Sequence, residues 1–212
     1  MKKNIKTFLL GLFTAVLATG CVGDDDYKLA PFDEPVWSEN FETPQDGITF
    51  AMPGWTNFNQ TGRKVWTKEA FPVPPVPLPP DFVYNGYAEF TTFGSGDAVN
   101  VGWLITPAIN IDGTGKALVF QTAQHHLESV NNKIEVLIST NYNGTDVLAA
   151  TWTPLTATFP TSATAWYKFV SSGRVSLAAY SGNVYIAFKV TGSGTDETLD
   201  GSYQIDNIKI LK

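Results

Sequence analysis

The sequence has little of the chemistry that thiol or zinc sites need. Its 212 residues include one cysteine and two histidines. A single cysteine can form no disulfide within the chain and no cysteine-rich metal site. The histidines, His125 and His126, are adjacent, and adjacent side chains of an extended strand point to opposite faces of a sheet. We therefore do not expect them to bind one metal ion together.

Positive charge is also scarce. The chain carries 14 Lys and Arg against 20 Asp and Glu, and three of its lysines lie within the first six residues. Without those three, the balance is 11 basic to 20 acidic side chains. Nucleic-acid-binding proteins show the reverse, a basic patch that meets the phosphates. This composition argues against a nucleic-acid partner.

Long apolar runs are absent except near the N-terminus. Residues 8–18 are mostly apolar, follow the early lysines and precede small residues. The run is short for a transmembrane helix, and the order of charged, apolar and small residues is that of a secretory signal. We predict that residues 1–20 are a signal peptide.

The single cysteine directly follows this segment. The run Leu17-Ala18-Thr19-Gly20-Cys21 resembles the bacterial lipobox. The resemblance implies that Cys21 is acylated and becomes the first residue of a lipoprotein held on the outer membrane. Each buried CH₂ of an acyl chain contributes about 0.8 kcal/mol, so two or three chains make a stable anchor. The alternative is a soluble exported protein with an incidental cysteine.

Residues 21–35 have the composition of an acidic tether. Asp24, Asp25 and Asp26 follow the cysteine closely, and no apolar period is present. The cluster is similar to the export signal of Bacteroidetes surface lipoproteins, which implies exposure on the cell surface. A solvated charge run in a linker is the alternative.

Residues 36–212 form one domain of short alternating runs separated by Gly, Pro, Asn and Asp. None of the runs sustains the 3.6-residue apolar period of a helix. The pattern predicts an all-β sandwich. The expected strands cover residues 36–42, 64–68, 84–91, 102–106, 116–126, 133–140, 165–171, 184–190 and 203–211.

The last expected strand contains a slip in its alternation. Apolar residues occupy odd positions up to Ile205 and even positions from Ile208. Such a slip predicts a β-bulge, which redirects the neighbouring side chains. We expect the bulge to place Asp206 on the same face as Ile208 and Ile210, where an unpaired carboxylate is costly.

Four stretches, in this order, carry a family resemblance. They are Gly54-Trp55-Thr56-Asn57, Trp103-Leu104-Ile105-Thr106-Pro107, Ile138-Ser139-Thr140 with Trp152, and Val184 to Lys189 running on to Ile205-Asp206-Asn207-Ile208. Together they resemble the choice-of-anchor J and cleaved-adhesin domains of Bacteroidetes surface proteins. The resemblance implies a jelly-roll sandwich like those of carbohydrate-binding modules and MAM-type domains, often with structural calcium. It implies no particular ligand.

Glu39 and Asp206 are the candidate metal ligands. Strict alternation puts Glu39 on one face with Trp37 and Phe41, so it should point inward. In jelly rolls of this type the first and last strands are neighbours, which would bring the two carboxylates together. Like charges in one pocket need a cation, and Ca²⁺ accepts carboxylate and carbonyl oxygens. The alternative is an ion pair, with Arg63 or Lys64 as the cation, or hydrogen bonds to backbone amides.

Aromatic residues are the candidate ligand-binding side chains. Exposed Trp and Tyr rings stack on sugar rings, and an exposed aromatic patch marks a binding surface. Trp55 and Tyr87 are our candidates for such contacts. We expect Trp66, Trp103 and Trp166, which lie in expected strands, to be buried.

Residues 71–80 contain most of the prolines in the domain and should run as an extended polyproline segment. The segment is interpreted as a rigid loop that covers a sheet edge. The alternative is a stiff surface for a partner.

No nucleophile elbow, phosphate loop or dinucleotide fingerprint is present. A pair of carboxylates among Glu89, Asp97, Glu128 and Glu135 could in principle hydrolyse a glycan, but nothing singles out two of them. The interpretation is a non-catalytic surface lipoprotein that binds a glycan or another surface component. An adhesin or structural subunit that contacts protein and a small glycan hydrolase are the alternatives.

Overall fold

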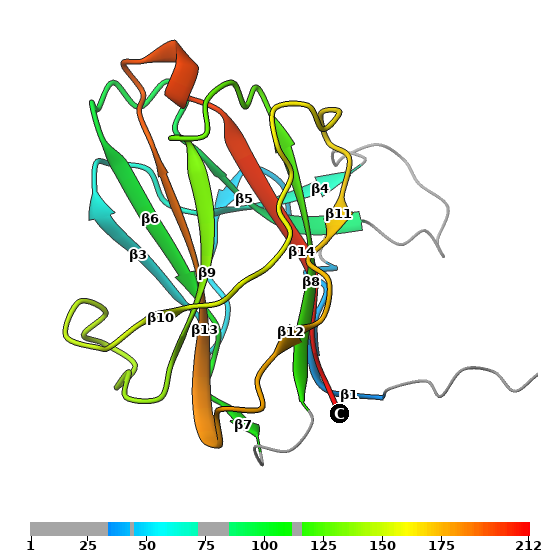
Figure 1. Cartoon of the computed structure of the whole chain (residues 1–212). Coiled ribbons are helices and arrows are strands. Elements are labelled where there is room, and N and C mark those ends of the chain that lie inside the picture. Colours follow the sequence, from blue (N-terminus) through cyan, green and yellow to red (C-terminus); the bar gives the residue numbers. More distant parts are fainter. Residues whose placement is uncertain (1–33, 43–44, 72–84, 112–115) are drawn as a thin grey trace, which may run out of the picture. The chain divides into compact units, whose positions relative to one another are not determined.

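The computed structural model describes residues 34–42, 45–71, 85–111 and 116–212 (Figure 1). The predicted signal peptide, Cys21, most of the tether and the proline-rich residues 72–80 lie outside the described residues. All described residues belong to one compact unit, Asp33–Lys212. Among them, no helix has the length and apolar character needed to cross a membrane.

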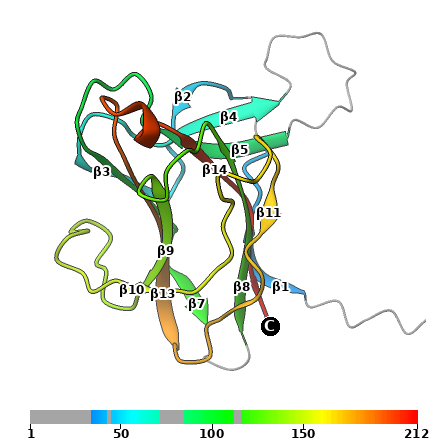
Figure 2. The same cartoon turned by 45° about the horizontal axis from the view of Figure 1, so that its top comes forward.

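Two antiparallel sheets lie in separate layers, which confirms the predicted all-β sandwich (Figures 1 and 2). Sheet A has the order β11-β8-β14-β5-β4-β2, with β1 beside β14 and β12 beside β8. Its strands are β1 (Pro35–Glu39), β2 (Ile48–Thr49), β4 (Thr67–Phe71), β5 (Asn85–Thr91), β8 (Ala117–His125), β11 (Val170–Ser171), β12 (Val175–Ser176) and β14 (Ser202–Leu211).

Sheet B has the order β10-β9-β13-β6-β3, with β7 beside β13. Its strands are β3 (Thr56–Thr61), β6 (Asn100–Ile105), β7 (Ile109–Ile111), β9 (Lys133–Ser139), β10 (Thr153–Pro154) and β13 (Gly182–Gly192). A single turn of 3-10 helix, η1 (Glu197–Leu199), precedes β14.

The main core fills the space between the sheets. Alternate residues of the long strands point inward, and Phe90, Phe120 and Phe188 are almost fully buried. Gly102 of β6 faces Phe90 of β5, and a Cβ atom at Gly102 would lie 2.0 Å from the ring. Glycine at this position therefore allows the Phe90 ring to lie against the backbone of the opposite sheet.

The outer face of sheet B is closed by the loop that follows β9. Tyr142, Val147 and Trp152 of this loop pack against Trp103, which is 4% exposed. Tyr142 also donates a hydrogen bond from its hydroxyl to Thr56 Oγ1 at 3.0 Å. This face of the sandwich is thus covered by the chain's own aromatic side chains.

The closing strand β14 contains the predicted bulge. Its register with β8 shifts between Asp206 and Lys209, and Asn207 has a φ of +50°. At the same place the neighbour on its other edge changes from β5, which pairs with residues 202–205, to β1, which pairs with residues 208–211. The first described strand and the C-terminus therefore lie side by side (Figure 1).

The predicted strand over residues 165–171 is wrong, because only Val170 and Ser171 pair with β8. Tyr167 has a φ of +58°, which breaks extended backbone. Trp166, expected to be buried, is 56% exposed as a result. Trp66 and Trp103 are buried as predicted. The alternation also missed β3 and the short strands β2, β7, β10 and β12.

Candidate functional site

Polar side chains line up across the outer face of sheet A, the face turned away from the core. The register pairs Glu89 of β5 with Gln204 of β14, and Gln204 with Ala123 of β8. One row further along, Thr91 is level with Ser202, and Ser202 with His125. Because paired residues of an antiparallel sheet share a face, these residues lie together although they are far apart in sequence.

Glu89 is the centre of this arrangement. Its Oε2 accepts a hydrogen bond from Gln204 Nε2 at 2.6 Å and lies 3.4 Å from Nε2 of His125. The side chain of Glu89 is 15% exposed. Gln204 and Ser202 are each 1% exposed, and Gln204 Oε1 and Ser202 Oγ have no hydrogen-bond partner among the described residues. Buried polar atoms without a partner are costly, so they mark this part of the sheet as a place to look for a polar ligand.

The two histidines meet, contrary to the prediction that they point to opposite faces. β8 ends at His125, and His126 adopts a φ of +56°, which turns its side chain back. The two Nδ1 atoms lie 2.8 Å apart, a hydrogen bond in which one imidazole donates to the other. The alternation rule failed here because the strand stops between the two residues.

Each imidazole supports an aromatic ring of the segment before β11. Tyr167 stacks on His125 with ring centroids 4.8 Å apart, and Trp166 lies over His126 at 4.0 Å. The segment is attached to β8 by Tyr167 N, which donates to Gln124 O, and by Gln124 Nε2, which donates to Thr164 O. Periodicity gave no signal for this feature, because residues 165–171 were expected as one continuous strand.

Two pockets follow one another on this face. The first has a volume of about 450 Å³, and the second, on the far side of the Gln204–Glu89 hydrogen bond, about 340 Å³. The first is lined by Phe71, Asn85, Tyr87, Tyr167, Phe169 and Gln204. The second is lined by Glu89, Thr91, Phe93, His125, His126, Asp200 and Ser202. We call the two together the outer-face site.

The exposed aromatic side chains of the described residues surround this site. Phe71 and Phe93 are 68% and 69% exposed, and Trp166 and Tyr167 are each 56% exposed. Three of the four line a pocket, and Trp166 stacks on His126, which lines the second. Large exposed rings gathered on one face indicate a binding surface.

The two aromatic candidates from the sequence lie in different places. Tyr87 lines the first pocket and contacts Phe169 edge-on, with ring centroids 6.2 Å apart. Burial, followed by the charges of Glu89 and neighbouring carboxylates, raises the pKa of Tyr87, so its hydroxyl stays protonated. Trp55 instead packs against Phe41 and Phe50 at the edge of the main core.

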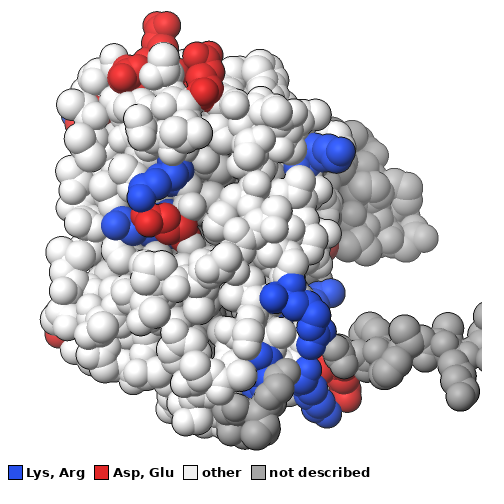
Figure 3. Space-filling view, viewed as in Figure 1, with Lys and Arg blue, Asp and Glu red and all other residues white. Residues whose placement is uncertain are grey.

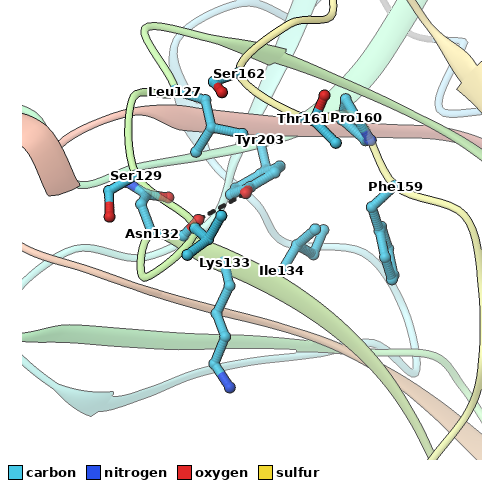
Figure 4. Close-up of a pocket in the computed structure, with 11 residues that line it drawn as sticks. Leu127, Ser129, Asn132, Lys133, Ile134, Phe159, Pro160, Thr161, Ser162 and Tyr203 are labelled. Carbon is cyan, nitrogen blue, oxygen red and sulfur yellow. Dashed lines mark hydrogen bonds between the residues drawn. The ribbon is translucent and has the colours of Figure 1, made fainter.

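A further pocket of about 200 Å³ opens at the start of β9. Figure 4 shows Leu127, Ile134 and Tyr203 turned toward one another, with Phe159 to one side and Lys133 pointing away. Tyr203 donates its hydroxyl hydrogen to Asn132 O at 2.8 Å, drawn as a dashed line. The walls are largely apolar and carry no exposed aromatic ring, unlike the outer-face site.

The two candidate metal ligands do lie on neighbouring strands, since Glu39 pairs with Ile208 across β1 and β14. Asp206 is 3% exposed, but its register partner is the exposed Gln121, so the predicted face, shared with Ile208, is wrong. Its carboxylate accepts hydrogen bonds from the backbone and side-chain nitrogens of Asn207. Burial raises the pKa of Asp206 to about 7, and the charges of Glu42 and Glu39 contribute.

Glu39 has backbone partners of its own. Its Oε1 accepts from the amides of Asn40 and Phe41, at 3.1 and 2.8 Å. Within the described ranges, no three His, Cys, Asp or Glu side chains group closely enough to hold a metal ion. The described carboxylates therefore do not form the oxygen-rich set that Ca²⁺ favours, and calcium at this junction stays a prediction.

The four carboxylates considered for hydrolysis have separate surroundings. Glu89 belongs to the outer-face site, whereas Asp97 forms an ion pair with Arg63 and Glu135 one with Lys133. Of the four, Glu89 alone lines one of the pockets described above. No opposed pair of them is brought together there.

Charged side chains occur in small separate groups on the face shown in Figure 3. Lys and Arg side chains gather at the lower right of this view, and the other described charges on this face stand apart from them (Figure 3).

Comparison with known proteins identifies the family. Residues 76–211 match the model of the Domain of unknown function DUF5017, and the chain belongs to this family. No curated protein sequence matches the chain significantly. Choice-of-anchor J membership is not among these matches and stays a prediction.

Solved structures show the fold. The K1 cleaved adhesin domain of Lys-gingipain from Porphyromonas gingivalis W83 has a TM-score of 0.50 and 20% identity, covering 82% of this chain and 96% of that domain. The K2 domain of Lys-gingipain has a TM-score of 0.50 and 16% identity, covering 83% and 97%. The predicted likeness to cleaved-adhesin domains is thus confirmed at the level of the fold.

Replacing Asp206 by Asn should stabilise the protein at pH 8 in calcium-free buffer by about 1–3 kcal/mol. At this pH the buried carboxylate is ionised, which costs the folded state up to 1.36 kcal/mol for each pH unit between the folded and unfolded pKa values, and Asn carries no charge. Since the folded pKa of Asp206 is raised to about 7, its stabilising contribution is present in acid and is lost as the pH rises through that value. The gain should vanish near pH 4. Urea unfolding at both pH values measures it, with Glu128→Gln as an exposed control. A less stable variant at pH 8 would contradict this expectation.

The calcium prediction is checked in the same system. Calcium that binds the folded state raises the melting temperature by mass action. Added Ca²⁺ should then raise the melting temperature of the EDTA-treated wild type and leave that of Asp206→Asn unchanged. Identical melting curves with and without Ca²⁺ in the wild type would rule the site out.

Replacing Gln124 by Leu should release the aromatic segment. The fully buried Gln124 also accepts from Leu127 N, so the variant leaves Leu127 N and Thr164 O without their partners, at about 1–3 kcal/mol per buried group. We expect lower stability in urea and faster proteolysis within residues 161–169. Gln121→Leu on the exposed face of the same strand is the control. Equal proteolysis of the two variants would show that Gln124 does not anchor the segment.

Proposed function

We propose that the protein is a non-catalytic carbohydrate-binding lipoprotein that holds a glycan against the outer-face site. One observation carries the proposal: four exposed aromatic rings lie around two pockets whose linings also contain the polar side chains of Glu89, His125, His126 and Asn85. Sugars combine apolar C–H faces with many hydroxyl groups, so they need both kinds of contact.

The two kinds of group have distinct roles in this proposal. Tyr87, Tyr167 and Trp166 offer ring faces or edges to the sugar rings. Glu89 accepts hydrogen bonds from sugar hydroxyls, and a charged acceptor strengthens such bonds. Gln204 Oε1 and Ser202 Oγ have no partner among the described residues, and a small shift of either side chain toward the ligand would give it one.

The contrast between the two outer faces supports this choice of site. The outer face of sheet B is covered by its own loop, whose rings pack on Trp103. On sheet A, the segment before β11 leaves its rings exposed beside the pockets. A ligand that buried these rings would gain roughly 25 cal/mol for each Å² of apolar surface removed from water.

We also propose that acylated Cys21 anchors the domain to the outer membrane, with residues 21–35 as the tether and the domain on the cell surface. The lipobox-like sequence before Cys21 and the aspartates after it support this location. An adhesin that contacts protein is the second candidate, because exposed aromatic patches also bind proteins.

Replacing Tyr87 or Trp166 by Ala should weaken glycan binding about five- to thirtyfold, since stacking of an aromatic ring contributes about 1–2 kcal/mol. Glycan-array screening of the purified domain identifies a ligand, and calorimetry measures its affinity. Leu148→Ala is the matched control, because Leu148 is 63% exposed but lies in the loop over sheet B. Sugar release during the assay would favour a hydrolase, and binding to protein without glycan would favour an adhesin.

Replacing Cys21 by Ser should move the protein from the membrane fraction to the soluble fraction, because it removes the acylation site. Protease treatment of intact cells should digest the wild-type protein if the domain is outside. Digestion only after lysis would place the domain inside the outer membrane.

A further inference from the structure

The two pockets of the outer-face site are lined by the same two strands. The first pocket meets Tyr87 and Gln204, and the second meets Glu89, Thr91 and Ser202, which are the following outward residues along β5 and β14. Outward residues of a strand succeed one another at about 6.6 Å. The two cavities therefore follow each other along the strand direction.

The boundary between the pockets is a shared wall. The Gln204–Glu89 hydrogen bond joins a residue of the first lining to one of the second. The stack of Tyr167 on His125 does the same on the β8 side. Tyr167 is 56% exposed, so a ligand that crosses this wall meets an aromatic surface there.

Apart from the two histidines, the titratable groups with a charge in the two linings are acidic. Glu89 and Asp200 line the second pocket, and Glu69 of β4 is the register neighbour of Tyr87 on the same face. Burial, followed by the charges of Glu89 and Asp46, also raises the pKa of Glu69. Neither lining contains Lys or Arg. Lys168 lies between two lining residues, Tyr167 and Phe169, in the sequence but is not itself part of the lining.

Building on the proposed glycan-binding function, we propose that the two pockets form one groove for a neutral oligosaccharide chain, and that the groove rejects polysaccharides bearing carboxylate or sulfate groups. The oligosaccharide crosses the Tyr167–His125 stack and places sugar rings in both pockets. A single terminal sugar fills one pocket and forfeits the contacts of the other. An anionic sugar meets Glu89, Asp200 and Glu69 where neither lining contains Lys or Arg, and like charges in a partly desolvated site repel.

The experiment measures affinity against chain length and charge. Neutral gluco-, xylo- and manno-oligosaccharides from one to six units are titrated calorimetrically into the purified domain, together with oligogalacturonates of the same lengths. We expect affinity for a neutral series to rise at least tenfold from the monosaccharide until both pockets are filled, and the matching uronates to bind at least tenfold more weakly. Raising NaCl from 20 mM to 500 mM should narrow that gap, because salt screens exposed charges.

Variants separate the two parts of the proposal. Tyr87→Ala and Phe93→Ala remove one ring from each pocket, so each should weaken long chains more than single sugars. Glu69→Gln removes a charge that lines neither pocket, and should narrow the gap between neutral and anionic chains. Glu135→Gln, on sheet B, is the matched control and should leave that gap unchanged.

Two outcomes would overturn this inference and leave the glycan-binding function standing. One is uronates that bind as tightly as neutral chains, and the other is a monosaccharide that binds as tightly as a hexasaccharide. If no sugar of any kind binds, the proposed function itself fails and the inference fails with it.

Discussion

The pairing of β14 with β8 is the interaction on which the rest of the structure depends. β8 accompanies β14 from Ser202 to Leu211, while the other edge of β14 is shared between β5 and β1. The bulge at Asp206 and Asn207 stands where the partner changes. It adds one residue to β14, so that Tyr203 and Ile205 before it and Ile208 and Ile210 after it all reach the core. One strand thereby joins both ends of the domain and supplies the floor of the outer-face site.

The same pairing explains why the site lies where it does. Residues of β14 that alternate with the core residues must face outward, and the register sets Gln204 beside Glu89 and Ser202 beside His125. Polar groups are thus held on a rigid sheet, and the aromatic rings come from the chain around it. Sheet B lacks a comparable surface because its own loop covers Trp103. The outer face of sheet B is closed because the loop after β9 folds back over it, whereas the pockets on the outer face of sheet A stay open.

The site carries local backbone conformations that are uncommon for non-glycine residues. His126 and Tyr167 both have positive φ values, which cost free energy unless the surroundings hold them. Here the imidazole hydrogen bond and the two ring stacks do so. Periodicity assumes continuous extended backbone, which is why it predicted opposed histidines and a buried Trp166. The bulge in β14 was predictable, since there the apolar pattern itself records the slip.

Composition and alternation by themselves determined the all-β class, most of the long strands and the bulge. A sheet with one buried face needs apolar residues at every second position, and this period can be read directly from the sequence. They also drew attention to Tyr87 among the aromatic residues. The tertiary structure decided which carboxylate meets which partner. Glu89 and Gln204 are 115 residues apart, and only strand register brings them within 2.6 Å. The tertiary structure also decided whether an aromatic ring is buried or exposed. Trp166 is exposed because the backbone turns at Tyr167, and a positive φ at one residue leaves no periodic pattern in the sequence.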